Sequence, residues 1–200
     1  MKSIEREIKI LSHVSEIEFI LDELGVLSKM ETQHVLSMRI GQESHKLKIK
    51  KTLDNQTVYL FSKKQPVKIK EDTFNSNFSS KLEEEVIMTE EEFKVSEKLF
   101  RLLFENQKMM DYVIEKKRYD SFKGYKIDIC KVIQVNDKSD YYTERFIEVE
   151  TDSQYNEEKI SLEQLLELLI PNESNIIAIN CGMRNLNRFY KRTSIFKARK

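Results

Sequence analysis

The sequence contains few of the residues that interrupt a chain or cross-link it. Among its 200 residues are four Gly, two Pro and two Cys. So little Gly and Pro argues against long disordered linkers. Cys130 and Cys181 are too few for a disulfide framework and are not spaced as metal ligands, so we expect free, buried thiols in a reducing compartment.

Excess charge of either sign and long apolar runs are also absent. The chain has 34 basic and 34 acidic residues, and this balance does not favour a nucleic-acid binder that works by bulk electrostatics. No run approaches the roughly 20 apolar residues of a membrane helix. The N-terminus is acidic and alternating, unlike a secretory signal. These features predict a cytoplasmic protein without a membrane partner.

Charged residues that alternate with apolar ones are abundant. In residues 4–11, Glu5, Glu7 and Lys9 alternate with isoleucines, which is typical of a strand with one polar face. Further strands are expected at about 33–41, 45–52, 56–64, 81–88, 111–120, 124–135, 143–151 and 175–181. The expected fold is α+β and dominated by antiparallel sheet.

Three helices are expected between these strands. Ser15 and Glu18 form a possible capping box for the first helix, and Gly25 is its expected end. Thr89 and Glu92 form the second box, which opens a helix to about residue 107. Its predicted core face is Phe93, Leu99, Leu102 and Leu103. Ser161 and Gln164 cap the third helix, which Pro171 ends.

Several strands carry charge on one face, with acids and bases in separate clusters. Any single strand of this kind is more often a solvated outer face. Five such strands instead favour a closed antiparallel eight-stranded β-tunnel with a polar interior, because a closed sheet of about eight strands can hold one ligand inside. Carboxylates bind hard cations, and Lys or Arg bind phosphate oxygens. The pattern therefore indicates a polyanion held with a divalent cation.

The charged strands resemble, in order, the motifs of the CYTH, or triphosphate tunnel metalloenzyme, superfamily. Residues 5–9 are similar to its E-x-E-x-K opening. The later matches are residues 47–50 (L-R-x-R), 64–66 (K-x-P), 81–85 (R-x-E-x-E), 116–118 (K-x-R), 127–128 (the "lD" strand) and 146–150 (F-x-E-x-E). This likeness spans residues 4–170, and we expect one such domain over 1–182, followed by a basic tail at 183–200.

The resemblance implies a role for each matching residue. The expected ligands of Mg²⁺ or Mn²⁺ are Glu5, Glu7, Asp128, Glu148 and Glu150. The expected phosphate-binding residues are Lys9, Lys48, Lys50, Lys64, Lys81, Lys116 and Arg118. Glu83 and Glu85 would hold a second metal or position the attacking water, although salt bridges to neighbouring lysines are an equally good interpretation of these two residues. Asp128 would join the metal ligands or orient a water molecule.

The implied activity is water attack on the terminal phosphate of inorganic triphosphate, a nucleoside triphosphate or thiamine triphosphate. A class IV-type adenylyl cyclase, an RNA 5′-triphosphatase with an RNA 5′ end as partner, and a polyphosphate- or nucleotide-binding domain without catalysis are the alternatives. The oligomer is expected to be a monomer or homodimer. The sequence departs from the family pattern at Glu144–Phe146, in place of G-x-F, and by having lysine for arginine at Lys48 and Lys50. A D-x-Y-x-D stretch is also missing around residues 30–40.

Overall fold

The computed structural model describes residues 2–12, 14–24, 27–67, 79–105, 109–136, 145–151, 160–170 and 176–179. The basic tail at 183–200 lies outside the described residues. Of Glu5 the structure describes the backbone and not the side chain.

The described chain contains nine strands and three helices. The strands are β1 (Lys2–Ser12), β2 (Leu27–Ile40), β3 (Glu43–Thr52), β4 (Thr57–Pro66), β5 (Ser79–Met88), β6 (Met110–Phe122), β7 (Tyr125–Val135), β8 (Arg145–Thr151) and β9 (Ile176–Ile179). The helices are α1 (Val14–Leu24), α2 (Glu90–Leu103) and α3 (Leu162–Leu169). The predicted α+β class is confirmed.

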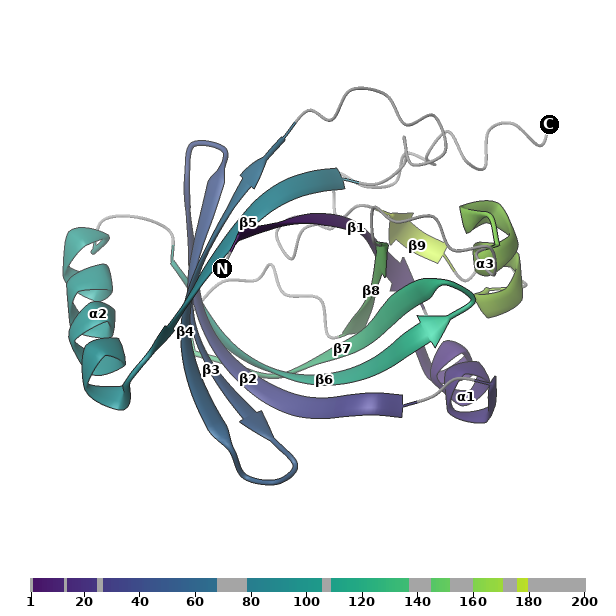
Figure 1. Ribbon diagram of the computed structural model, residues 1–200, viewed down its shortest axis with the longest axis horizontal. Helices are drawn as coiled ribbons and strands as arrows, with labels where there is room; N and C mark the ends of the chain where they lie inside the picture. The colour runs from purple at the N-terminus through teal and green to yellow at the C-terminus, as the bar shows by residue number, and fades with distance from the viewer. Residues whose placement is uncertain are drawn as a thin grey trace.

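The strands form one curved antiparallel sheet in the order β5-β4-β3-β2-β6-β7-β8-β1-β9 (Figure 1). Strand β1 also pairs with β5, from Lys2 opposite Glu84 to Glu7 opposite Ser79. The predicted antiparallel strands and three helices are thus present, and β9, which pairs with β1, is the strand expected at 175–181.

Tight turns fix the register of two neighbouring hairpins. Lys123 and Gly124, between β6 and β7, both have positive φ, at 50° and 83°. Two such residues in a row are required by a type I′ turn, whose twist matches that of the strands it joins. Between β2 and β3, Gly41 has a φ of 58°.

Two of the three predicted helix caps are confirmed. Thr89 with Glu92, and Ser161 with Gln164, each make both hydrogen bonds of a capping box. The first box is wrong: α1 already includes Val14, so Ser15 lies inside the helix. Glu18 instead forms an ion pair of 2.5 Å with Lys117.

The predicted core face of α2 is also corrected. Phe93 is buried as predicted, and Phe100 is buried as well, whereas the side chains of Leu99, Leu102 and Leu103 are exposed. The aromatic rings pack against the outer face of β2, β3 and β4, where Tyr59 lies with its ring centroid 5.3 Å from that of Phe93. Leu99 and Leu102 are on the face that no described strand covers.

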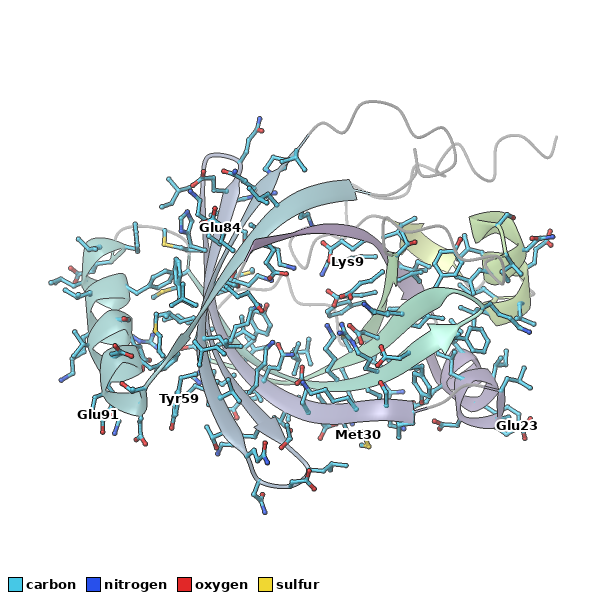
Figure 2. The ribbon with its side chains drawn as sticks, viewed as in Figure 1. Lys9, Glu23, Met30, Tyr59, Glu84 and Glu91 are labelled. Atoms are coloured by element: carbon cyan, nitrogen blue, oxygen red, sulfur yellow. The ribbon has the colours of Figure 1, made fainter. Side chains whose placement is uncertain are left out.

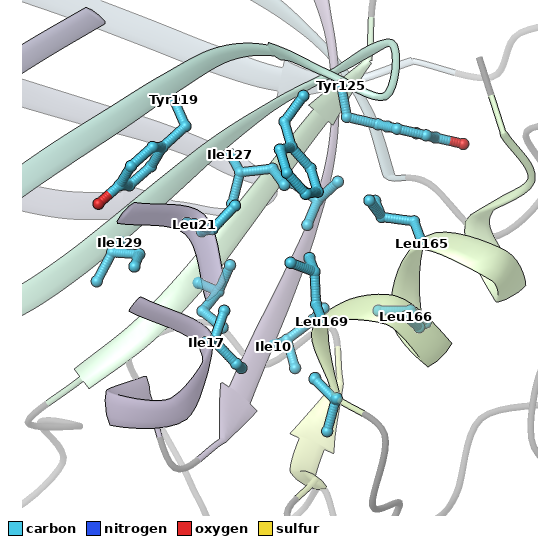
Figure 3. Close-up of a cluster of buried hydrophobic side chains, with 14 of the residues drawn as sticks. Ile10, Ile17, Leu21, Tyr119, Tyr125, Ile127, Ile129, Leu165, Leu166 and Leu169 are labelled. Carbon is cyan, nitrogen blue, oxygen red and sulfur yellow. The ribbon is translucent and has the colours of Figure 1, made fainter. Parts of the chain in front are cut away.

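The main apolar core lies on the convex side of the sheet (Figure 3). Ile17 and Leu21 of α1 and Leu165 of α3 pack there on isoleucines from β1, β7 and β8. Side chains alternate along a strand, so burying Ile8 and Ile10 beneath the helices turns Glu7 and Lys9 to the concave side. None of the described helices is long and apolar enough to cross a membrane.

Candidate polyanion and metal site

Charged side chains from neighbouring strands meet on the concave side of the sheet. Pairing places Glu7 opposite Glu150, and Lys9 opposite Glu148, between β1 and β8. Asp128 of β7 lies opposite Glu148, and Arg118 of β6 lies opposite Asp128. Figure 2 shows Lys9 pointing from β1 into this concave side, toward β6 and β7. Residues from four strands therefore share one site.

Three carboxylates form the centre of the site. Asp128, Glu148 and Glu150 each offer an oxygen, and these oxygens lie within 4.8 Å of one another. Asp128 is fully buried and Glu148 is 8% exposed. Carboxylate oxygens are the ligands preferred by Mg²⁺ and Mn²⁺, so the donor set fits a hard divalent cation.

Bases surround these carboxylates closely. Lys116 Nζ lies 2.6 Å from an oxygen of Asp128 and 2.8 Å from one of Glu148. Arg118 donates two hydrogen bonds to Asp128, of 2.7 and 2.6 Å, in the bidentate geometry that a guanidinium favours.

Two further contacts complete this group. Arg118 also donates to Glu150 at 3.1 Å. Lys9 donates to Glu148 and lies above the ring of Phe146, 5.2 Å from its centroid. We call Lys9, Lys116, Arg118, Asp128, Glu148 and Glu150 the acidic wall.

The acidic wall perturbs the pKa values of its own members. Burial alone would raise the pKa of Glu148, but the attraction of Lys116 and Lys9 outweighs it and holds the pKa well below its usual range. Burial raises the pKa of Glu150 to about 7, because the attraction of Lys116 offsets only part of the desolvation cost. Three crowded carboxylates therefore do not all ionise easily, and a bound cation would relieve this.

Lysines line the facing strands β3 and β4. Lys48 Nζ lies 3.1 Å from Glu85 and 3.6 Å from Glu83, and Lys64 lies 3.3 Å from Glu83. We call Lys46, Lys48, Lys50 and Lys64 the lysine wall. Burial lowers the pKa of Lys50, and repulsion by Lys48 adds to this effect.

Most of the predicted site residues lie in the acidic wall or the lysine wall. Glu5, Glu7 and Lys81, on β1 and β5, belong to neither wall. Of the five expected metal ligands, Asp128, Glu148 and Glu150 form the cluster found among the described side chains. Glu7 is buried and accepts a hydrogen bond from Lys81. Burial would raise the pKa of Glu7, but attraction, led by that of Lys9, lowers it to about 2. At its backbone, Glu5 pairs with Lys81.

Glu83 and Glu85 were expected either to take part in the reaction or to form salt bridges with neighbouring lysines. Both carboxylates lie in ion pairs with the lysine wall, which is the salt-bridge reading of these residues. The pKa of Glu85 is lowered: burial opposes this, and attraction by Lys48 outweighs it.

Sequence reasoning did not identify Lys46 as a site residue. Lys46 precedes the motif match at residues 47–50, but it continues the alternation of Lys48 and Lys50 on the same face of β3. That alternation was the signal that could have found it. Burial is the largest cause that lowers its pKa, to about 7, and repulsion by Lys64 follows.

Solved structures with a similar fold were found, although no family model and no curated protein sequence matches the chain. The PH1819 protein from Pyrococcus horikoshii OT3 is 22% identical, with a TM-score of 0.52, over 82% of this chain and 88% of that one. The PH1012 protein from the same organism is 14% identical, with a TM-score of 0.55, over 94% and 99% of the two chains.

A third similar structure comes from a plant. HpAC1 from Hippeastrum, a proposed adenylyl cyclase with a dominant triphosphatase activity, is 15% identical, with a TM-score of 0.50. The match covers 99% of this chain and 94% of HpAC1. At these identities the likeness shows a shared fold.

Proposed function

We propose that this chain, which has the fold expected of the CYTH or triphosphate tunnel metalloenzyme superfamily, is a metal-dependent phosphohydrolase that acts on a triphosphate. The observation that carries the proposal is the cluster of Asp128, Glu148 and Glu150, set among bases and facing a row of lysines. Such a surface suits a polyanion bound together with a cation. We further propose that the β1–β5 pairing closes the sheet into a tunnel.

Asp128, Glu148 and Glu150 would hold the cation, with Glu5 and Glu7 as the further ligands expected from the E-x-E-x-K motif. Bound there, Mg²⁺ or Mn²⁺ would neutralise charge that develops on the phosphate oxygens. In the structure Lys116 and Arg118 occupy oxygens of these same carboxylates. Their release from the carboxylates would free both bases to bind phosphate.

The remaining bases would position the phosphate chain from the opposite side. Lys48, Lys50 and Lys64 face the acidic wall, while Lys9 and Lys81 reach the site from β1 and β5. Charge-assisted hydrogen bonds to phosphate oxygens would replace their present carboxylate partners. Once Lys48 and Lys64 have made this exchange, Glu83 and Glu85 would be available to orient a water molecule for in-line attack.

The test is a panel of triphosphates read by the identity of the products. Purified protein is incubated with inorganic triphosphate, ATP, thiamine triphosphate and a 5′-triphosphate RNA, with Mg²⁺, Mn²⁺ or EDTA. We expect release of orthophosphate that requires a metal. Binding without turnover in either metal would overturn the proposal and leave a polyphosphate-binding domain.

A second activity, adenylyl cyclisation, is favoured by the likeness to HpAC1. Cyclisation uses the ribose 3′-hydroxyl of ATP as the nucleophile in place of water. Chromatography of the ATP reaction separates cyclic AMP with pyrophosphate from ADP with orthophosphate, so the same panel decides between the two.

A further inference from the structure

Lys46 occupies the position on the lysine wall next to Lys48. In the paired strands it lies opposite Ser37 of β2 and opposite Ser62 of β4. Residues directly opposite each other in an antiparallel pair share a face of the sheet. Ser62 in turn lies opposite Glu85, which contacts Lys48, so Lys46 and both serines are on the concave side.

Lys46 lacks the partners that its neighbours have. Lys48 and Lys64 are paired with Glu83 or Glu85, and Lys9 is paired with Glu148. Among the described side chains, none forms a hydrogen bond or ion pair with Lys46 Nζ. The lysine is only partly buried, so a ligand can reach it.

Ser62 gives a second, independent indication of a ligand. Its side chain is 0% exposed, and its hydroxyl has no hydrogen-bond partner within the described part of the chain. A buried polar group that lacks a partner costs free energy, so such groups are uncommon in folded proteins. A hydroxyl donor beside an ammonium donor is suited to an oxyanion.

The charges around Lys46 also favour an anion. Lys64 of β4, Lys9 of β1 and Lys48 of its own strand repel it. Glu148 of β8 attracts it, but that carboxylate is already bonded to Lys9 and Lys116. Strand β2 contributes the uncharged Ser37 opposite Lys46, and Glu85 of β5 is paired with Lys48.

We propose that Lys46 and Ser62 form a phosphate subsite that binds one phosphoryl group of the triphosphate. This subsite lies beside the phosphate-binding residues expected from the family motifs. The inference rests on the proposed function and adds to it a subsite outside the family motifs. Binding transfers a proton from solvent to the fraction of Lys46 that is neutral, and the resulting ammonium donates to a phosphate oxygen. The Ser62 hydroxyl donates to the same group.

The experiment is calorimetric titration of the full chain with inorganic triphosphate in EDTA, so that neither metal binding nor turnover contributes. For Lys46→Met we expect roughly tenfold weaker binding, since a charge-assisted hydrogen bond is lost. Ser62→Ala should weaken binding by a factor of about three, and Lys46→Arg should retain most of the affinity. Lys51→Met is the matched control, because Lys51 lies on the same strand with its side chain exposed.

Proton uptake provides a readout that a merely structural role would not change. Titrations at pH 7 in buffers of different ionisation enthalpy give the number of protons bound with the anion. With the pKa of Lys46 at about 7, wild type should take up roughly half a proton more than Lys46→Met. A parallel titration with orthophosphate tests whether free phosphate binds the subsite at concentrations similar to those of triphosphate. Such binding would assign the subsite to the reaction product and contradict the proposal.

The outcomes separate this inference from the proposed function. If wild type binds and hydrolyses triphosphate while Lys46→Met matches it in affinity and proton uptake, only the subsite is overturned. If wild type neither binds nor hydrolyses triphosphate, both are overturned. Thermal unfolding of each variant shows whether it folds, and Lys46→Arg keeps the charge if the methionine variant does not fold.

Discussion

The two charged walls on the concave side of the sheet differ in how completely their charges are paired. On the acidic wall, bases contact every carboxylate of the cluster, and Lys116 and Arg118 each contact two of them. On the lysine wall, Glu83 and Glu85 pair with Lys48 and Lys64, and Lys46 is left with repulsive neighbours. The acidic wall is thus held by internal ion pairs, whereas Lys46 of the lysine wall has no partner among the described side chains. Under the proposed function, a bound triphosphate would supply the anion that Lys46 lacks.

The largest expected effect is on the acidic wall. Glu148→Gln removes a proposed metal ligand and leaves Lys9 and Lys116 short of a partner. We expect kcat/KM for triphosphate hydrolysis to fall roughly 100-fold or more. Breaking the buried pairs should also reduce the free energy of unfolding by about 3 kcal/mol. Steady-state kinetics with Mg²⁺ or Mn²⁺ and denaturant titration measure the two effects.

Glu115→Gln is the control for this change, because Glu115 is exposed and lies 3.9 Å from Lys131 at the surface. We expect wild-type kinetics and a change in unfolding free energy of about 0.5 kcal/mol or less. A Glu148→Gln variant as active as Glu115→Gln would show that the acidic wall is not a metal centre.

On the lysine wall the expected effect is smaller and falls on binding. Lys48→Met removes one proposed phosphate donor and the ion pairs that Lys48 makes with Glu83 and Glu85. We expect KM for triphosphate to rise about tenfold, with a smaller change in kcat. Lys51→Met should leave both constants unchanged. A fall in kcat at constant KM would instead place Lys48 in the chemical step.

The smallest effect is on stability and depends on pH. In the unfolded chain Lys46 has its ordinary pKa of 10.5, whereas in the folded protein the value is about 7. Below pH 7 the lysine is charged in both states, and the folded state carries the full penalty of the repelled charge. Between pH 7 and 10.5 the folded protein loses this proton first, so the penalty declines.

Lys46→Met should therefore be more stable than wild type at pH 6, and this advantage should shrink at pH 9. Melting temperatures in phosphate-free buffer measure it, with an expected difference of a few degrees at pH 6. Lys51→Met should show no such dependence on pH. If the stability advantage of Lys46→Met were equal at pH 6 and pH 9, Lys46 would be charged in the folded protein at both pH values. The lysine wall would then not contain a lysine with a lowered pKa.

Much of the fold could be predicted because the strands repeat one simple pattern. Alternation in residues 4–11 and 146–150 requires strands with one apolar and one charged face. The order of the motifs along the sequence predicts the order in which such strands follow one another. Local chemistry likewise predicted the caps at Thr89 and Ser161. These features depend on residues close together in the sequence.

What could not be predicted depends on residues that are far apart in the sequence. The capping box expected at Ser15 is wrong because α1 already includes Val14, and Glu18 pairs with Lys117, about 100 residues away. The helix period of α2 permits either Leu99 or Phe100 to face inward, and it is Phe100 that packs in the apolar cluster with residues of β2, β3 and β4. Lys46 could be assigned to the charged face, but its lack of a partner appears only when four strands are assembled.

The position of the apolar core has a consequence for how such a protein can change over evolutionary time. Ile8, Ile127 and Val149 belong to the core that packs with α1 and α3, and the charged side chains of the concave side are not members of that core. An ion pair such as Lys48 with Glu85 could be exchanged as a unit without opening a cavity in the core. The charged concave side can therefore diverge while the frame is preserved, in keeping with similar folds at 14–22% identity.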